Sequence, residues 1–190
     1  RDPFWSPDGK RIVFSRGHGP YQAQLGLLNP ADGSVKLLYG GDGELISSPY
    51  WGRDGKIYFT KQSPAAKTVT VSGQNYQVMD FGRGSIWAIN PEDGKTTAVI
   101  EDEYDNRIPA LSPDGTRLAF VSDRPTLKEG NGKFDRGSLF IKDLKSGRIY
   151  LVTTKVGLNG GSLSFSPDGK KLAFFTFRSI RPSVWVVNLP

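Results

Sequence analysis

The sequence predicts an all-β fold, a β-propeller built from four-stranded antiparallel blades. A turn motif occurs four times, and each copy is followed by a β-branched or aromatic run that predicts the second strand of a unit. A further run, which predicts the third strand, ends in Asn or Asp at equivalent places. Because each copy is one supersecondary unit, the number of copies predicts the number of blades. The copies are Phe4-Trp5-Ser6-Pro7-Asp8-Gly9, Tyr50-Trp51-Gly52-Arg53-Asp54-Gly55, Ala110-Leu111-Ser112-Pro113-Asp114-Gly115 and Ser164-Phe165-Ser166-Pro167-Asp168-Gly169.

The Ser-Pro-Asp-Gly motif suits a type I turn. Proline pre-sets the backbone angle, aspartate hydrogen-bonds local backbone, and glycine takes the left-handed position that follows. Between apolar residues, the motif predicts a short hairpin with a glycine bulge. The second copy has Gly52 and Arg53 in place of serine and proline, but its Asp54 and Gly55 still support the turn.

The strands that follow each turn are predicted from β-branched and aromatic runs bounded by turn residues. The second strands are Ile12-Val13-Phe14, Ile57-Tyr58-Phe59, Leu118-Ala119-Phe120 and Leu172-Ala173-Phe174. The third strands are Leu25 to Leu28, Ile86 to Ile89, Leu139 to Ile141 and Val184 to Val187. Fourth strands are predicted near Val35 to Leu38, Thr97 to Ile100 and Ile149 to Val152, and the last repeat lacks one.

The four meanders are predicted to stack face to face around a common axis. A small meander on its own leaves both faces in water, whereas neighbouring blades bury them. The apolar residue before each first turn is therefore expected to pack between blades, and a phenylalanine of each second strand forms another such column. These residues are Trp5, Trp51, Leu111 and Phe165, and then Phe14, Phe59, Phe120 and Phe174.

The repeats span approximately residues 1–47, 48–106, 107–160 and 161–190. They form a single propeller domain or a segment of a larger propeller. Because the last repeat is incomplete, a sheet edge would stay unpaired. Three explanations remain open: a segment of a larger propeller, which we favour, a small four-bladed ring, or two copies that assemble into one larger ring. A segment expressed by itself is expected to be unstable or to associate.

Composition excludes several classes of site. The formal net charge of +6 comes from 25 basic and 19 acidic residues that are scattered, without a basic helix or an aromatic platform, so nucleic acid is not a predicted partner. The absence of cysteine excludes disulfides and thiolate metal sites. No apolar run approaches the roughly 18 residues of a membrane-spanning helix.

The predicted binding face is the end of the blades that carries the irregular loops, because recognition groups concentrate on loops held by a rigid scaffold. The insertion over residues 62–84 is predicted to form a projecting hairpin, which either binds a partner or folds over a neighbouring blade. The candidate binding residues are His18, Tyr21, Tyr76, Arg83, Tyr104, Arg107, Arg124, Arg178 and Arg181.

The charged candidates on this face have alternative roles. Arg124 and Arg178 follow equivalent strands and either bind an anionic group or pair with nearby acids. Asp102 and Asp105 are weak candidates for calcium, since their segment lacks the interleaved spacing and central glycine of a calcium loop. His18 is the only histidine. Without a glycine-serine elbow or a phosphate loop beside it, no independent enzyme is predicted.

The pattern Pro-x-Trp-Ser-Pro-Asp-Gly-Lys-x-Ile-x-Phe, with a third strand that ends in Asn or Asp, resembles the propeller repeat of the TolB family. The resemblance covers essentially the whole chain. It implies a non-catalytic binding or scaffold module with a protein partner, in a bacterial periplasmic or extracellular setting, as part of an envelope complex or a longer polypeptide. No cofactor is predicted apart from the weak calcium candidates. Only turn and strand motifs match, so no functional residue is carried over.

Related repeats imply two alternative functions. One is an accessory propeller of a serine peptidase or another hydrolase, which gates or positions substrate. The other is a carbohydrate-binding or lyase propeller, in which Trp87, Tyr21 or Tyr76 stacks on sugar rings.

Overall fold

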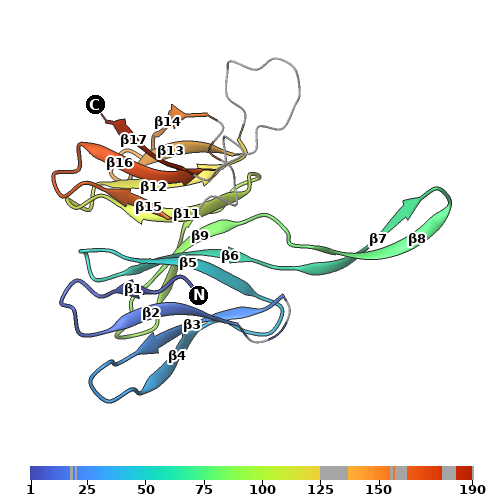
Figure 1. The fold of residues 1–190 in the computed structure, drawn as a ribbon, viewed down its shortest axis with the longest axis horizontal. Helices are drawn as coiled ribbons and strands as arrows, with labels where there is room; N and C mark the ends of the chain where they lie inside the picture. The colour runs from blue at the N-terminus through green and yellow to red at the C-terminus, as the bar shows by residue number, and fades with distance from the viewer. Residues whose placement is uncertain are drawn as a thin grey trace.

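The regular structure of the described chain is entirely β-strand, as the repeats predict. The computed structural model describes residues 1–17, 19, 21–124, 137–154, 156, 162–176 and 183–189. Four antiparallel blades follow one another in chain order, with the first blade at the bottom of Figure 1 and the third and fourth blades overlapping at the top. Within these residues there is no helix of the length and apolarity that a membrane span requires.

Blades 1 and 2 each contain four antiparallel strands. Blade 1 holds β1 (Phe4–Trp5), β2 (Ile12–Gly17), β3 (Ala23–Leu28) and β4 (Val35–Tyr39). Blade 2 holds β5 (Leu45–Trp51), β6 (Ile57–Gln62), β9 (Ser85–Ile89) and β10 (Thr96–Ile100). Between β6 and β9 the chain forms the predicted hairpin, whose strands are β7 (Ala65–Val71) and β8 (Gln74–Asp80). One parallel contact, between Ala23 and Leu45, joins the two blades into one sheet.

Blade 3 repeats this design and blade 4 shortens it. Blade 3 holds β11 (Asn106–Leu111), β12 (Arg117–Ser122), β13 (Ser138–Asp143) and β14 (Ile149–Thr153). Blade 4 holds β15 (Leu163–Phe165), β16 (Lys171–Thr176) and β17 (Ser183–Asn188), and the described residues supply no fourth strand to it. The predicted meanders and the short last blade are therefore confirmed.

The repeated turns have the chemistry that their sequence predicts. The turn glycines Gly9, Gly55, Gly115 and Gly169 have φ of 68°, 83°, 73° and 70°, in the left-handed region that favours glycine. In the three serine-containing copies the hydroxyl donates to the aspartate two residues on, and its oxygen accepts the amide five residues on. Where Gly52 replaces serine, the Asp54 carboxylate accepts the Tyr58 hydroxyl at 2.8 Å instead.

Replacing Ser112 with alanine is expected to raise the pKa of Asp114. Hydrogen bonds from the Ser112 hydroxyl and the Thr116 amide lower this pKa from its ordinary 3.8 to about 2. Because the folded-state pKa lies below the unfolded one, the turn's contribution to stability is present above about pH 4 and disappears as the pH falls toward 2. An NMR titration of the Asp114 carboxyl carbon measures the shift. An unchanged midpoint in Ser112→Ala would show that the hydroxyl does not stabilise the carboxylate.

Three apolar cores lie between successive blades, and each combines side chains of two neighbouring blades. Between blades 1 and 2, Trp51 and Phe59 pack against Val13 and Leu25. Between blades 2 and 3, Phe120 and Leu118 pack against Ile86. The third core includes Phe165, Phe174, Ala119 and Val121. This face-to-face burial is the stacking that a propeller requires.

The packing prediction holds for three blades and is wrong for the first. Trp51, Leu111 and Phe165 are buried, but 54% of the Trp5 surface is exposed, and Phe14 is only half-buried. Trp5 and Phe14 occupy the face that in later blades meets the preceding blade, and no described blade precedes blade 1. The opposite end of the stack has a matching open face, where Val184 and Val186 of β17 are exposed.

Candidate functional site

Described segments of blades 1, 2 and 3 meet at one end of the molecule, where they enclose a groove of about 590 Å³. Its walls come from the β2–β3 loop, the starts of β5 and β11 and the root of the inserted hairpin. Gln22, Gln62, Phe81 and Arg107 are among the side chains that line it. Segments far apart in the sequence therefore meet at the end of the molecule predicted to carry recognition.

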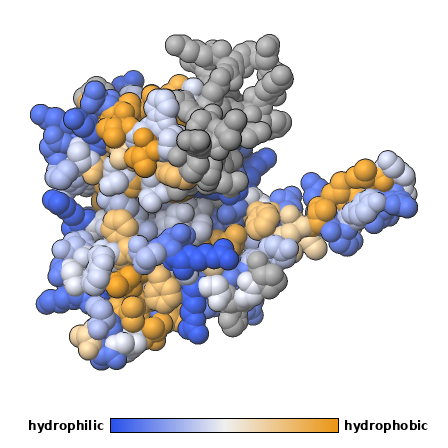
Figure 2. All heavy atoms as spheres, viewed as in Figure 1, coloured by the Kyte–Doolittle hydropathy of each residue, from blue (hydrophilic) through white to orange (hydrophobic). Residues whose placement is uncertain are grey.

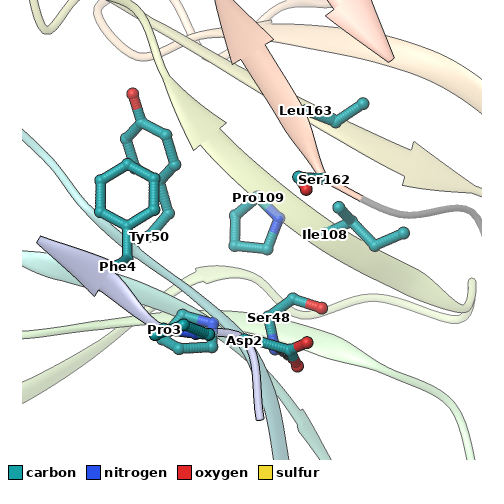
Figure 3. Close-up of a pocket in the computed structure, with 10 residues that line it drawn as sticks. Asp2, Pro3, Phe4, Ser48, Tyr50, Ile108, Pro109, Ser162 and Leu163 are labelled. Carbon is teal, nitrogen blue, oxygen red and sulfur yellow. Dashed lines mark hydrogen bonds between the residues drawn. The ribbon is translucent and has the colours of Figure 1, made fainter. Parts of the chain in front are cut away.

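A second cavity, of about 160 Å³, lies between the first strands of all four blades. Figure 3 shows its walls, which combine apolar rings with a few polar groups. Phe4 and Tyr50 pack together with ring centroids 4.5 Å apart on one side. Asp2 and Ser48 supply polar groups, and the Ser48 amide donates to the Asp2 carboxylate at 3.4 Å. Asp2 also lines the larger groove, so the two cavities adjoin.

This second cavity is lined at a backbone irregularity that repeats in blades 1, 2 and 3. Asp2, Ser48 and Ile108 have φ of 51°, 51° and 59°, although none of them is glycine. Each precedes a proline, and in β5 and β11 the strand register shifts at this point. A bulge here re-aims side chains toward the cavity. The sequence predictions missed these residues, although Pro49 in β5 and Pro109 in β11 are prolines inside a strand, which mark a bulge.

Arg107, one of the candidate binding residues, is held at the groove by a buried carboxylate. Its Nε and Nη2 donate to the two oxygens of Asp105 at 2.8 and 2.7 Å. The Gly84 amide donates to Asp105 at 2.7 Å. A side chain at Gly84 would collide with the Asn106 carbonyl, which lies 2.5 Å from the position of an added Cβ. Asp105 thus connects the segment between β8 and β9 to blade 3 and holds the Arg107 guanidinium in place at the groove.

Arg124 joins the acidic connection to blade 3. Its Nη2 donates to the Asp102 carboxylate at 2.8 Å and to the Asn106 side-chain oxygen at 3.1 Å. The guanidinium also lies over the rings of Tyr104, Phe120 and Phe140 at 5.1 to 5.4 Å. Of the two readings of Arg124, the structure shows the pairing with a nearby acid.

The two weak calcium candidates are engaged in these pairs. Asp102 accepts hydrogen bonds from Arg124, Asn106 and the Tyr104 amide, and Asp105 binds Arg107. Across the described ranges, no group of three or more His, Cys, Asp or Glu side chains is placed to hold a metal ion.

The aromatic candidates occupy different places. Tyr21 packs edge-on against Phe81 beside the groove, with ring centroids 5.6 Å apart. The Trp87 ring is covered by Lys61, whose Nζ lies 5.1 Å from its centroid and pairs with Glu44 at 2.6 Å. Trp87 is therefore a packing residue at the seam of blades 1 and 2, which weakens the prediction that it stacks on sugar.

Three candidates, His18, Arg178 and Arg181, lie outside the described residues, as do residues 125–136, which the sequence predicts to belong to a Gly-Lys-rich loop. Arg83 is exposed at the hairpin root. The structure thus places Arg107 in the groove and Tyr21 beside it. Tyr104 lies with Arg124 in a separate contact, and Tyr76 lies on the hairpin.

The inserted hairpin, β7 and β8, projects from the body as an arm (Figure 1). Its register places Val69 opposite Tyr76, Lys67 opposite Val78 and Val71 opposite Gln74 on one face. The other face carries Thr68, Thr70, Asn75 and Gln77, which hydrogen-bond across the strands. Hydrophobic residues are visible along the arm in Figure 2. Val71, Tyr76 and Val78 are exposed, although two-stranded hairpins are marginally stable in water.

The fold and the stacking of its sheets define a β-propeller-type protein. No family model matches the chain. It is 29% identical over 189 residues to a TolB homolog of Chlorobium luteolum, an alignment that covers 76% of this chain and 43% of the relative. A TolB structure from Agrobacterium tumefaciens superposes with a TM-score of 0.67 over 99% of this chain and 61% of the other, at 19% identity.

These similarities confirm the predicted resemblance to TolB-like β-propellers. A second kind of relative is also present: the uncharacterized peptidase YuxL of Bacillus subtilis is 29% identical over 143 residues, covering 63% of this chain and 21% of the peptidase. The chain therefore spans less than half the length of these curated relatives.

Proposed function

We propose that this chain is a non-catalytic binding module that engages a protein partner with its loop-rich end. The projecting arm carries the proposal, because its apolar face is exposed and its root lines the groove of about 590 Å³ at the loop-rich end. Exposed apolar surface of this kind, bordered by polar residues, is typical of protein-interaction sites. Phe81 and Tyr21 continue the apolar surface from the arm to the groove.

The similarity to TolB homologs supports a bacterial periplasmic or extracellular setting and membership of an envelope complex. Nucleic acid is not part of the proposal, since the basic residues are scattered. The partner is a protein that presents an apolar strand or loop to the arm and polar groups to the groove.

Deleting the arm is expected to abolish partner capture while leaving the blades folded. The variant replaces residues 65–80 with a short Gly-Ser turn, and a matched control carries Thr68→Lys and Gln77→Glu on the polar face. Capture from an envelope extract of the source organism, followed by mass spectrometry, is compared between the two at equal thermal stability. Undiminished capture by the arm-deleted chain would place recognition elsewhere.

The second candidate function is an accessory propeller of a hydrolase, which the peptidase similarity favours. In that case the loop-rich end would position a peptide for a catalytic domain in the same polypeptide. A fluorophosphonate probe that labels active serines, applied to the intact polypeptide from its native source, distinguishes the two. Labelling supports the hydrolase, and no labelling removes it.

A further inference from the structure

Seven Asp-Gly pairs occur in the sequence, and all of them lie within the described residues. An aspartate followed by glycine is chemically reactive, because the glycine nitrogen lies within reach of the side-chain carboxyl and glycine has no Cβ to hinder the approach. The pairs are Asp8-Gly9, Asp32-Gly33, Asp42-Gly43, Asp54-Gly55, Asp93-Gly94, Asp114-Gly115 and Asp168-Gly169.

The reaction passes through a succinimide ring. The glycine amide nitrogen attacks the aspartate carboxyl carbon, a C–N bond forms, and water leaves, made of the carboxyl OH and the amide proton. Water then opens the ring at one of its two carbonyls and gives either aspartate or isoaspartate, in which the main chain runs through the side-chain methylene. The net change is an isomerisation that consumes no reagent. It requires an amide that loses its proton to solvent and a protonated carboxyl that is free to turn toward the nitrogen.

Six of the seven pairs are held by two hydrogen bonds that oppose these requirements. The glycine amide donates to a backbone carbonyl three or four residues earlier, at 2.8 to 3.1 Å. The aspartate carboxylate accepts the backbone amide two residues after it, at 2.8 to 3.2 Å. The amide proton is therefore withheld from solvent, and the carboxylate is held on a different amide.

Serine hydroxyls add to this protection in four of the six pairs. Each donates a hydrogen bond that lowers the pKa of the aspartate carboxyl, and the pKa of Asp114 falls to about 2. Because the ring closes from the protonated carboxyl, a lower pKa leaves less of the reactive form at neutral pH. The other three of these carboxyls are those of Asp8, Asp32 and Asp168.

Asp42-Gly43 differs from the other six pairs in both hydrogen bonds. It lies between β4 and β5, in a turn that closes when the Glu44 amide donates to the Gly41 carbonyl at 3.4 Å, so this amide does not bind the Asp42 carboxylate. Gly43 is the third residue of the turn, with φ of 78°, and its amide has no hydrogen-bond partner among the described residues. Both residues are exposed, and no atom lies within 4 Å of a Cβ added at Gly43. Water therefore reaches the amide and the carboxyl.

The same turn connects blades 1 and 2. The Gly41 amide donates to the Glu44 carboxylate at 2.9 Å, and this carboxylate pairs with Lys61 of β6 at 2.6 Å. The Glu44 carbonyl accepts the amide of Ala23, in β3, at 3.0 Å. Isoaspartate at position 42 lengthens the main chain by one carbon between Gly41 and Glu44, so the bonds that join the two ends of the turn lose their present geometry. Ala23 also lines the groove at the loop-rich end.

We propose that Asp42 is a site of spontaneous isoaspartate formation and that the modified residue loosens the connection between blades 1 and 2. The other six aspartates stay largely unmodified in the folded protein, because each pair keeps both hydrogen bonds. This covalent change concerns the blades themselves, so the inference does not depend on the partner-binding function proposed above.

The first test follows isomerisation in the folded 190-residue chain, incubated at 37 °C in a mildly acidic buffer. Isoaspartate is located in the digested protein by mass spectrometry with electron-transfer fragmentation, which distinguishes the two isomers. We expect isoaspartate to form at Asp42 at least tenfold faster than at any of the other six aspartates. Isomerisation at another pair as fast as at Asp42 would overturn the proposal.

The same incubation in urea separates the effect of the fold from that of the sequence. Unfolding removes the protecting hydrogen bonds, so all seven pairs are expected to isomerise within about threefold of one another. A tenfold preference for Asp42 that persists in urea would show that neighbouring residues, and not the folded structure, select this site.

Two matched variants, Asp42→Asn and Asp93→Asn, test the contrast by mass. Asparagine closes the same ring with loss of ammonia, and the hydrolysed product is one mass unit heavier. Both positions are exposed, but at position 93 the Gly94 amide is bonded to the Asn90 carbonyl and the side-chain oxygen can accept the Lys95 amide. Asp42→Asn is expected to deamidate at least tenfold faster than Asp93→Asn in the folded chain. Equal rates would contradict protection by these bonds.

Hydrogen exchange tests the structural consequence. The isoaspartate-containing fraction is separated by chromatography and compared with unmodified protein. The Ala23 amide is expected to exchange at least tenfold faster in the modified fraction, because its acceptor is the Glu44 carbonyl. The Asn106 amide, which donates to the Gly84 carbonyl at 2.8 Å in another part of the fold, is expected to exchange at an unchanged rate. Equal exchange of Ala23 in the two fractions would overturn the loosening of the connection.

Discussion

Replacing Phe120 with alanine is expected to lower the free energy of unfolding by about 3–5 kcal/mol. The side chain is fully buried in the core between blades 2 and 3. Its ring stacks on Phe140 with centroids 5.9 Å apart, and the Arg124 guanidinium lies 5.2 Å from it. Truncation removes these contacts and leaves a cavity that the rigid blades cannot close.

Phe14 is the control for this prediction, because it holds the same repeat position on the open face of blade 1. Phe14→Ala is expected to cost about 1–2 kcal/mol, in keeping with its partial burial. Urea unfolding monitored by tryptophan fluorescence, at an unchanged slope, measures both. Equal losses at the two positions would mean that blade-to-blade stacking does not determine the stability of this column.

Asp105→Ala is expected to lower the free energy of unfolding by about 3 kcal/mol, since breaking one side of a buried ion pair leaves an uncompensated charge. The Asp105 carboxylate accepts both Arg107 donors and the Gly84 amide. Removing it leaves the guanidinium without its partner at the groove and detaches the return of the hairpin from blade 3.

Glu92→Ala is the matched control for the buried carboxylate. Glu92 pairs with Arg11 at 2.7 Å, but its side chain is 71% exposed, so the loss is expected to stay below about 1 kcal/mol. Thermal unfolding by circular dichroism compares the two variants. If Asp105→Ala melts within a degree or two of Glu92→Ala, the Asp105 pair does not hold the site together.

The blades could be predicted from sequence because their signals are local. Each Asp-Gly turn fixes a reversal within a few residues, and the β-branched runs beside it favour strands without reference to distant residues. The arm was predictable for the same reason, from alternating residues around Ser72 and Gly73. Whether a side chain is buried depends on whether another blade packs against it, and the position of a residue within its repeat does not show whether such a blade is present. This explains why Trp5 was wrongly predicted to be packed while Trp51 was correctly predicted.

The candidate site was only partly predictable, because its geometry comes from contacts between distant segments. The sequence correctly predicts that Arg107 lies at the loop-rich end. It does not show that Arg107 binds the Asp105 carboxylate, which also accepts the Gly84 amide. Arg124 reaches an acid 22 residues away, a pairing that sequence spacing does not predict. The bulges at Ser48 and Ile108 left a detectable signal, since each precedes a proline within a strand, but that signal does not identify the cavity they line.

Recognition at the loop-rich end is tested most directly by site-specific photo-cross-linking. Benzoylphenylalanine is placed at Tyr21 and Tyr76 on that end, and at Lys56 and Lys170 beside the Asp-Gly turns of the opposite end. After irradiation in an envelope extract of the source organism, we expect one protein to be cross-linked at Tyr21 and Tyr76 and not at the two lysine positions. Cross-links to that protein from Lys56 or Lys170, with none from Tyr21 or Tyr76, would contradict binding through the loops.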